Sequence, residues 1–427
     1  MKNNIGFTMY NWIKDLYPFN RSLTGEGNRK TLRYIKKIIP QLSIKKVRSG
    51  TKCFDWKVPA EWNISEGYIE NQNNKKIIDF KNNNLHVIGY SKPIDKWINF
   101  NELNEHLYSL PKMKDAIPYV TSYYENRWGF CITHNERLKL NKKNKYHVVI
   151  KSSFSNGNMN YGELIIKGKT KKEILLSTYI CHPSMANNEL SGIAVTTFLS
   201  KWLLQNKNHF SYRILFLPET IGSIYYLSRN YKKMKKNIVA GYVVTCVGDN
   251  RCYSYLPSKI ENSLSNRAAK YILKRIDKKF KLYSFLDRGS DERQYCSPLI
   301  NLPIGSIMRS KYGEYPEYHT SKDNMKLVSP SGLSGGFVAI RKTIELIEKN
   351  FIYVNTFKCE PQLGKRNFYP TLSLPNSTEK IAPSMNLLAY ADGKNDLLEI
   401  SKIIKVDFED CYHIAENLCN LGVLKKV

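Results

Sequence analysis

The chain has 427 residues, an ordinary apolar content and a formal net charge of +29 at pH 7. This length exceeds what one hydrophobic core usually serves, so we expect two or three domains. No run approaches the roughly 18 apolar residues that a membrane-spanning helix needs, which argues against a membrane partner. The lysines are spread along the chain among many asparagines, as in 141–145, so the charge indicates a solvated surface rather than a nucleic-acid-binding face.

Nine cysteines are scattered along the chain, and no two of them form a Cys-x-x-Cys pair. The residues 1–9 lack the apolar core of a secretory signal. An odd number of unpatterned thiols is typical of a reducing compartment. We therefore expect a cytoplasmic protein.

Two segments near the start, 11–17 and 29–39, have apolar residues at helical spacing. They flank the stretch Asn20–Gly27, in which two glycines indicate a turn before the second helix. Arg21 lies in this stretch. It is either a surface or capping residue or part of a site, and the sequence favours neither reading.

Short segments of alternating polarity between residues 56 and 150 indicate a small β-rich unit. The segments expected to contribute to it are 67–70, 76–80, 85–90, 119–134 and 146–150. Cys131 and His134 could be metal ligands, but a histidine at the end of a strand is more often structural. We therefore interpret both residues as structural.

The chain beyond residue 173 repeats one pattern of buried strand, polar loop and helix. The apolar run 174–180 leads to His182 and to a helix that starts near Ser191. The run 212–217 leads to Glu219, and the run 239–247 leads to Asp249. Strands that alternate with helices predict a mainly parallel sheet whose loops meet at one edge.

These loops bring imidazole, amide and carboxylate groups from separate parts of the chain toward one place. A catalytic zinc needs such ligands together with an open position for water. A carboxylate beside a zinc-bound water can take its proton, and Glu219 is the natural candidate for this general base. The residues that we expect to meet are His182, Asn188, Glu189, Glu219, Asp249, Asp291 and His319.

The order of His182, the segment 187–192, Pro218–Ser223 and the segment 315–323 resembles the zinc-dependent aminopeptidases of the co-catalytic metal type. The stretches 19–27, 55–63 and 181–187 resemble more closely the aminopeptidase-like proteins often encoded among bacterial surface-polysaccharide genes. This resemblance covers essentially the whole chain. It implies an α/β, aminopeptidase-like mixed sheet flanked by helices, with a small inserted β domain and a C-terminal winged helix.

The implied domains have the following limits. Residues 1–55 and 151–356 form the two parts of the aminopeptidase-like domain, 56–150 form the insertion and 357–427 form the winged helix. The tail supports the last of these independently, because 386–402 and 408–422 have helical patterns that stop at glycines. The second of these patterns has few basic residues, so we expect docking on another domain or subunit, as in a homo-oligomer, rather than DNA binding.

Two positions depart from the aminopeptidase pattern. Asn188 stands where those enzymes typically have a metal-binding aspartate, and the acid has moved to Glu189. Thr220 stands where two-metal members have a second glutamate. Asparagine offers only a neutral carbonyl oxygen, which holds zinc less tightly than a carboxylate, so we expect at most one ion.

We therefore predict a mononuclear zinc hydrolase that cleaves an amide in an aminoacyl or peptide-like conjugate of cell-surface glycan metabolism. His182 and His319 are the expected ligands, with Asn188 or Glu189, and Asp249, completing the shell. The residues expected to position the substrate are Asp291, Arg293 and Tyr318. The alternatives are a non-catalytic descendant that binds a glycan or protein and, less favoured, a DNA-binding regulator that acts through the winged helix.

Overall fold

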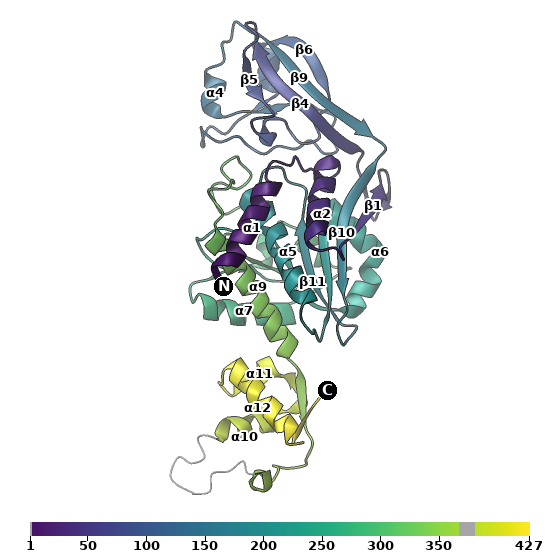
Figure 1. Ribbon diagram of the computed structural model, residues 1–427, viewed down its shortest axis with the longest axis vertical. Helices are drawn as coiled ribbons and strands as arrows, with labels where there is room; N and C mark the ends of the chain where they lie inside the picture. The colour runs from purple at the N-terminus through teal and green to yellow at the C-terminus, as the bar shows by residue number, and fades with distance from the viewer. Residues whose placement is uncertain (1, 367–380) are drawn as a thin grey trace. The chain divides into compact units, whose positions relative to one another are not determined.

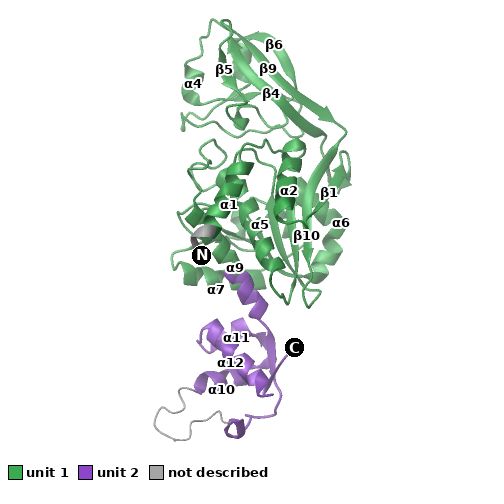
Figure 2. Ribbon diagram, in the orientation of Figure 1, with its two compact units in different colours: residues 1–341 green, residues 342–427 purple. Residues whose placement is uncertain are grey.

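The structure of the chain is a computed structural model that describes residues 2–366 and 381–427 (Figure 1). The chain forms two compact units, residues 1–341 and residues 342–427 (Figure 2). No helix within the described residues is both long and apolar enough to cross a membrane.

The larger unit is built on an eight-stranded mixed sheet. The strands lie in the order β1 (Ser43–Arg48), β10 (Asn158–Ile166), β12 (Ser211–Leu217), β11 (Glu173–Tyr179), β13 (Ile238–Val244), β16 (Ile304–Met308), β14 (Ser254–Leu256) and β15 (Lys281–Leu282). The four strands β12, β11, β13 and β16 are parallel to one another, and β14 is parallel to β15. The pairs β1–β10, β10–β12 and β14–β16 are antiparallel. This arrangement confirms the expected mixed sheet.

Every residue of β11 and β12 is buried, because helices cover both faces of the sheet. Besides two short helices of the insertion, the helices of this unit are α1 (Lys2–Leu16), α2 (Glu26–Ile38), α5 (Ser191–Leu204), α6 (Ile221–Asn237), α7 (Leu264–Ile276), α8 (Glu292–Tyr295) and the first part of α9 (Pro330–Lys349) (Figure 1). Ile224 and Leu227 of α6 share one apolar cluster with Leu215 and Val243 of the sheet. The loops that follow β11 and β12 carry His182 and Glu219.

The segment between β1 and β10 forms a separate four-stranded antiparallel sheet. Its order is β5 (Lys76–Asp79), β4 (Glu61–Asn71), β9 (Lys145–Ser155) and β6 (Ile94–Asn99), and it has an apolar core of its own. Because β1 and β10 pair with each other in the large sheet, the sheet continues on both sides of this insertion. The predicted boundary at residue 150 falls inside β9, so the inserted sheet extends to Ser155.

Two segments predicted as strands of the insertion have other conformations. Residues 84–86 form a 3-10 turn, and within 119–134 only Phe130–Cys131 (β8) forms a short strand, which pairs with Leu107–Tyr108 (β7). Leu85, Val87 and Ile88 are all buried, so the apparent alternation does not separate an inner from an outer face. Residues 85–90 are therefore buried on both sides and form isolated β-bridges instead of the regular strand that the sequence predicted.

Cys131 and His134 have structural roles, as expected. The carbonyl of buried Cys131 lies 2.8 Å from Nδ1 of His86. His134 opens the short helix α4 (His134–Leu138), and its Nδ1 lies 3.1 Å from Ser109 Oγ. Neither residue belongs to a group of potential metal ligands within the described residues.

The smaller unit combines a three-stranded sheet, β18 (Asp392–Asp396), β17 (Ile352–Asn355) and β19 (Leu424–Lys426), with three helices. The helices are α10 (Ala382–Tyr390), α11 (Leu397–Ile403) and α12 (Phe408–Asn420). This is the arrangement of a winged helix. The predicted start at residue 357 is too late, because β17 already pairs with β18 and β19.

His147 in β9 lies between two carboxylates of the inserted sheet. Its Nδ1 is 2.8 Å from Glu70 Oε1, its Nε2 is 2.8 Å from Asp95 Oδ1, and Trp97 stacks on its ring. Partial burial lowers the pKa of His147, but the two carboxylates outweigh burial and raise this pKa above its usual value. The stabilisation is therefore fully present below the unfolded-state pKa of about 6.5 and is lost as the pH rises through the folded-state pKa.

We expect His147→Gln to lower the free energy of unfolding by about 0.2–1 kcal/mol at pH 5.5 and by less at pH 8.5. The measurement is urea unfolding at both pH values, followed by tryptophan fluorescence. His134→Gln, at a partly buried position of the same insertion whose Nδ1 contacts only the Ser109 hydroxyl among the described residues, is the control. An equal loss at the two pH values would show that the ion pairs with the imidazolium contribute nothing.

Candidate metal and catalytic site

His182, directly after β11, lies at the centre of the candidate site. Its ring is almost fully buried, with Nδ1 3.0 Å from Glu189 Oε2 and Nε2 3.5 Å from Glu219 Oε2. Burial lowers the pKa of His182, but Glu189 and Glu219 outweigh burial and raise it. Glu189 thus orients the ring from one side and leaves Nε2 directed toward Glu219.

The carboxylate of Glu189 is already occupied by protein donors. Its oxygens accept hydrogen bonds from the backbone N–H groups of Cys181 (2.7 Å) and His182 and from Arg21 Nε (2.7 Å). Cys181, His182 and Glu189 do place three potential ligand atoms within 4.8 Å of one another. Burial raises the pKa of the Cys181 thiol well above its usual value, and its Sγ accepts a hydrogen bond from the Glu219 N–H at 3.2 Å. Glu189 therefore supports and orients the ring of His182 through Nδ1, and its role as a metal ligand stays a prediction.

Arg21 is a buried part of this support and neither a surface nor a capping residue. Its Nε also donates to the carbonyl of His182 at 3.0 Å, and its Nη1 donates to the carbonyl of Leu16 at 2.7 Å. The side chains of Arg21 and Glu189 are both completely buried. The ion pair therefore ties the turn between α1 and α2 to the loop after β11.

Glu219 lies in a strained turn between β12 and α6, and its side chain is 22% exposed. Ser290 Oγ donates to Glu219 Oε1 at 2.7 Å. Burial raises the pKa of Glu219, although His182, Ser290 and Arg293 oppose this rise. The next residue, Thr220, has a φ of 64°, a conformation that costs energy for a β-branched residue.

Asp291 holds this strained turn and does not face a substrate. It is completely buried, and its Oδ1 accepts hydrogen bonds from the Thr220 N–H and from Ser223 Oγ, both at 2.8 Å. Burial, together with the charge of Glu219, raises the pKa of Asp291 to about 7. Its predicted role in substrate binding is therefore corrected to support of the Glu219 turn.

Arg293 and Tyr318 are better placed to meet a substrate. Arg293 is exposed, and its Nη2 donates to Thr220 Oγ1 at 2.8 Å. Tyr318 stacks on the ring of His319, with 3.9 Å between the ring centroids and 13° between the planes. These two side chains remain available as a cation and an aromatic wall beside Glu219 and His319.

His319 lies 5.4 Å from His182, measured between ring centroids, and has a φ of 54°. The Nε2 atom is buried and has no hydrogen-bond partner among the described residues. Burial and the neighbouring His182 lower the pKa of His319 to about 3, so the ring is neutral. A neutral imidazole with an unpartnered nitrogen is the form that binds a metal.

The insertion supplies Tyr119 and Tyr123 to this site, which the sequence did not indicate. The edge of the Tyr119 ring contacts His182 and His319 at centroid distances of 5.3 and 5.0 Å, and its N–H donates to the His319 carbonyl. Tyr123 Oη lies 3.0 Å from Tyr119 Oη. Both tyrosines lie in a stretch that resembles a strand, so no local pattern marks them as site residues.

Asn188 is completely buried in the π-helical turn Ala186–Leu190. Its side-chain oxygen is 2.8 Å from Tyr179 Oη, which is itself 2.5 Å from Thr245 Oγ1. Thr245 donates its only hydroxyl hydrogen to the backbone carbonyl of Asn188 at 2.5 Å. The Tyr179 hydroxyl must therefore donate to Thr245 Oγ1. Amide oxygen and nitrogen are assigned from such networks, and the same side chain turned over would donate an N–H to Tyr179 Oη and would place its oxygen in the buried position of Nδ2, which has no partner among the described residues.

Asp249 has a structural role that corrects its prediction as a ligand. Its two oxygens accept hydrogen bonds from Asn187 Nδ2 (3.0 Å), from the N–H and Oγ of Ser310 (2.9 Å each) and from the Arg251 N–H (2.9 Å). Within the described residues it does not join the group around His182.

The sequence did not single out Asp323 as a residue of the site. Its carboxylate accepts hydrogen bonds from the backbone N–H groups of Asn187 and Asn188 at 2.6 and 2.9 Å.

Comparison with known proteins places this site in a family. The profile of a family described as a domain of unknown function, DUF4910, matches residues 10–350, and a winged helix-turn-helix profile matches residues 351–426. The chain belongs to the DUF4910 family. It is 45% identical, over 99% of its own length and 97% of the relative's, to a Clostridium acetobutylicum protein provisionally named a polysaccharide biosynthesis protein with an aminopeptidase-like domain.

Solved structures agree with this assignment. A crystal structure from Clostridium acetobutylicum, provisionally described as a peptidase, has a TM-score of 0.92 and 44% identity, covering 100% of this chain and 97% of the other. The zinc aminopeptidase BSAP of Bacillus subtilis has a TM-score of 0.58 at 14% identity, covering 79% of this chain and 94% of that chain. An aminopeptidase from Aneurinibacillus has a TM-score of 0.53 at 15% identity, covering 80% of this chain and 93% of that chain. At such low identity the two aminopeptidases establish only the aminopeptidase-like fold of this DUF4910 chain.

The residues of this DUF4910 chain include groups that would hold a metal ion. His319 Nε2 is buried without a hydrogen-bond partner among the described residues, His182 Nε2 faces Glu219 Oε2, and Asn188 has one buried side-chain amide atom without a partner there. Nitrogen and oxygen donors of this kind suit zinc. The carboxylates of Glu189 and Asp249 are engaged by protein donors on both oxygens, whereas Asp291 accepts hydrogen bonds at Oδ1 and its buried Oδ2 has no partner among the described residues.

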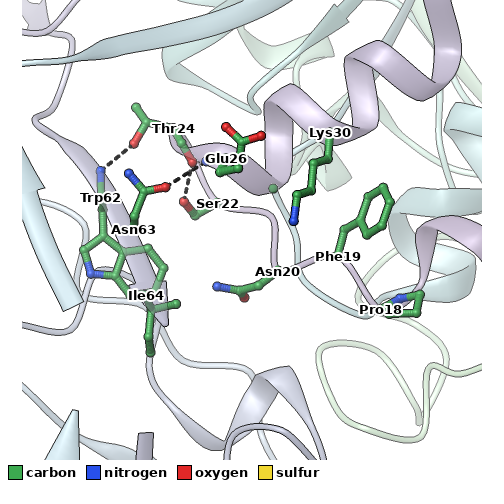
Figure 3. Close-up of a pocket in the computed structure, with 11 residues that line it drawn as sticks. Pro18, Phe19, Asn20, Ser22, Thr24, Glu26, Lys30, Trp62, Asn63 and Ile64 are labelled. Atoms are coloured by element: carbon green, nitrogen blue, oxygen red, sulfur yellow. Dashed lines mark hydrogen bonds between the residues drawn. The ribbon is translucent and has the colours of Figure 1, made fainter. Parts of the chain in front are cut away.

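The stretch 19–27, one of those that carried the family resemblance, has a structural role. It lines a polar cavity of about 170 Å³ between the start of α2 and β4, together with Lys30, Trp62 and Asn63 (Figure 3). Thr24 Oγ1 accepts the Trp62 N–H at 3.0 Å, and Asn63 Oδ1 accepts the Glu26 N–H at 2.8 Å. These hydrogen bonds attach the inserted sheet to the larger domain of the DUF4910 fold.

Proposed function

We propose that this chain is a mononuclear, metal-dependent amide hydrolase that acts on an aminoacyl or peptide-like conjugate in cell-surface polysaccharide metabolism. The observation that carries the proposal is the position of Glu219 Oε2, 3.5 Å from His182 Nε2, whose ring lies 5.4 Å from the neutral ring of His319. The aminopeptidase-like fold supports the reaction class. The name of the Clostridium acetobutylicum relative supports the setting in polysaccharide biosynthesis.

Zinc, when bound by His182, His319 and the Asn188 oxygen, supplies Lewis-acid polarisation of a carbonyl and lowers the pKa of a water. Glu219 then receives the proton of the attacking water at Oε2, while Ser290 fixes its other oxygen. Burial raises the pKa of Glu219, which brings proton uptake and release closer to neutral pH. Arg293 is placed to pair with a carboxylate of the substrate, and Tyr318 forms a wall beside His319.

A degenerate binding protein is the second candidate, and one observation favours it. The acid that follows Asn188 in the sequence, Glu189, forms an ion pair with Arg21. The position of the expected aspartate is therefore filled by a neutral amide. A site with two imidazoles and one amide holds zinc less tightly than a site with a carboxylate. Metal affinity therefore separates the two candidates.

We expect the purified chain to bind one zinc ion, Asn188→Asp to bind it at least ~10-fold more tightly, and His319→Ala to bind it at least ~10-fold more weakly. The aspartate adds a charged ligand, whereas the alanine removes a nitrogen ligand. Zinc titration by calorimetry, with metal analysis of the dialysed protein, measures both changes. His134→Ala in the insertion is the matched control. If the parent binds no zinc and Asn188→Asp does, the hydrolase proposal fails and the binding protein is favoured.

For the winged helix we propose docking on a protein surface, such as a second copy of the chain, rather than on nucleic acid. Its third helix, α12, contains no lysine or arginine, and it exposes Glu409 and Asp410 in its first turn. A helix that enters the major groove needs cationic or amide side chains near its N-terminal end. Acidic residues in that position repel phosphates.

A further inference from the structure

A second, unassigned surface lies where the insertion joins the larger domain. A groove of about 620 Å³, called here the hairpin groove, is lined by Ser49, Gly50, Lys57–Ala60, Tyr124 and Phe154–Asn156. This volume is within the ~300–1,000 Å³ range of small-molecule sites. None of these residues takes part in the candidate metal site.

The hairpin groove is bordered by large aromatic side chains that are open to solvent. Tyr124 is 55% exposed, Phe154 is 44% exposed and Trp56 is 41% exposed. The rings of Trp56 and Tyr124 lie 6.1 Å apart in an edge-on arrangement. Exposed aromatic clusters of this kind mark interaction sites more often than solvated surface.

The groove also has unpaired polar and cationic groups. Lys52 and Lys57 lie directly opposite each other in the two-stranded hairpin formed by β2 (Lys52–Cys53) and β3 (Trp56–Lys57). Like charges in this position destabilise a hairpin, and within the described residues neither ammonium has an ion-pair partner. Of the two lysines only Lys57 lines the groove, and Ser49 lines it with a buried Oγ that has no hydrogen-bond partner among the described residues.

We propose that the hairpin groove binds an acidic oligosaccharide. The C–H faces of pyranose rings pack on the negative faces of aromatic rings, which Tyr124, Phe154 and Trp56 supply. The sugar hydroxyls find hydrogen-bond partners in Ser155 and Asn156. Carboxylates on the sugar pair with Lys52 and Lys57 and relieve the repulsion between these two lysines.

The groove is connected to the metal site by a chain of aromatic contacts. Phe154 packs on Tyr90 at 6.0 Å, Tyr90 packs on Tyr123 at 5.7 Å, and Tyr123 is hydrogen-bonded to Tyr119, which contacts both histidines. The same loop thus carries Tyr124 into the groove and Tyr119 into the site. This inference deepens the proposed function, on which the choice of a saccharide rests, and assigns the groove to the glycan part of the conjugate.

The test is calorimetric titration of the full-length, metal-free chain with two probes at low salt. One probe is a hexasaccharide of alternating glucuronic acid and N-acetylglucosamine, and the other is the neutral hexamer of N-acetylglucosamine. We expect the acidic probe to bind more tightly and the Lys52→Gln/Lys57→Gln variant to bind it about 5- to 10-fold more weakly. Raising the salt weakens binding of the acidic probe and leaves the neutral probe unchanged.

Trp56→Ala and Tyr124→Ala should weaken binding of both probes, because they remove the stacking surface. The matched control is Tyr390→Ala/Lys394→Gln, at exposed positions of the smaller unit, which should bind as the parent does. The inference is overturned if the parent binds neither probe at millimolar concentration, or if the control loses affinity equally. It is also overturned if the groove variants change only self-association in light scattering, which would make this face an interface between copies of the chain.

The outcome is separable from that of the proposed function, because no metal is present in the titration. Saccharide binding by a chain that does not bind zinc would support the proposal for the groove and contradict the hydrolase proposal. Zinc binding without saccharide binding keeps the hydrolase and refutes the groove.

Discussion

Replacing Arg21 by methionine is expected to lower the free energy of unfolding of the larger unit by about 3–5 kcal/mol, the cost of breaking a buried ion pair. Glu189 would remain completely buried with only its backbone donors, next to His182. Urea unfolding followed by tryptophan fluorescence measures this loss. All 6 tryptophans lie at or before residue 202, so the fluorescence reports on the larger unit alone.

A double-mutant cycle separates the ion pair from simple loss of packing. Arg21→Met/Glu189→Met removes both charges, so it should recover much of the stability lost in the single variant. Arg21→Lys keeps the charge but loses the separate donors to Glu189 and to the carbonyls of Leu16 and His182, so it should remain destabilised. A loss below about 1 kcal/mol for Arg21→Met would mean that Arg21 behaves as a surface residue.

Replacing Glu219 by glutamine is expected to reduce hydrolysis by roughly 10²–10⁴-fold while leaving zinc affinity nearly unchanged. The amide keeps the size of the side chain and can still accept the hydrogen bond from Ser290, but it cannot accept the proton of the water. Hydrolysis of a panel of aminoacyl nitroanilides and zinc titration give the two readouts. Glu314→Gln, at an exposed position, is the matched control.

Zinc titration of Glu219→Gln also tests the role of this residue. Glu219 Oε2 is near enough to His182 Nε2, at 3.5 Å, for both atoms to reach one ion. A fall in zinc affinity of ~10-fold or more would therefore make Glu219 a ligand and remove it as the base. Full hydrolysis by Glu219→Gln, with unchanged zinc affinity, would show that another group takes the proton.

The sequence was most informative where structure depends on local pattern. The apolar runs of β11, β12 and β13 were recognisable because parallel strands buried on both faces are continuously hydrophobic. Their polar loops then placed His182 and Glu219 at one edge of the sheet. The helices of the tail were recognisable for a similar reason, because amphipathic spacing and glycine stops are properties of neighbouring residues.

The sequence was less informative in the insertion and at the domain limits. Residues 85–90 alternate in polarity but are buried from two sides, so the pattern carried no information about pairing. The boundary at residue 150 was wrong by part of a strand, because β9 continues to Ser155 without a change in composition.

The sequence by itself determined which elements form and which of their ends carry chemical groups, because those properties depend on neighbouring residues. Only the tertiary structure decided which of these groups remain available. Arg21 and Glu189 are 168 positions apart, and their pairing turns the displaced acid into a support for His182. Both oxygens of Asp249 and one oxygen of Asp291 are likewise occupied by donors that no local pattern identifies, because a hydrogen bond formed across the fold leaves no periodicity in the chain.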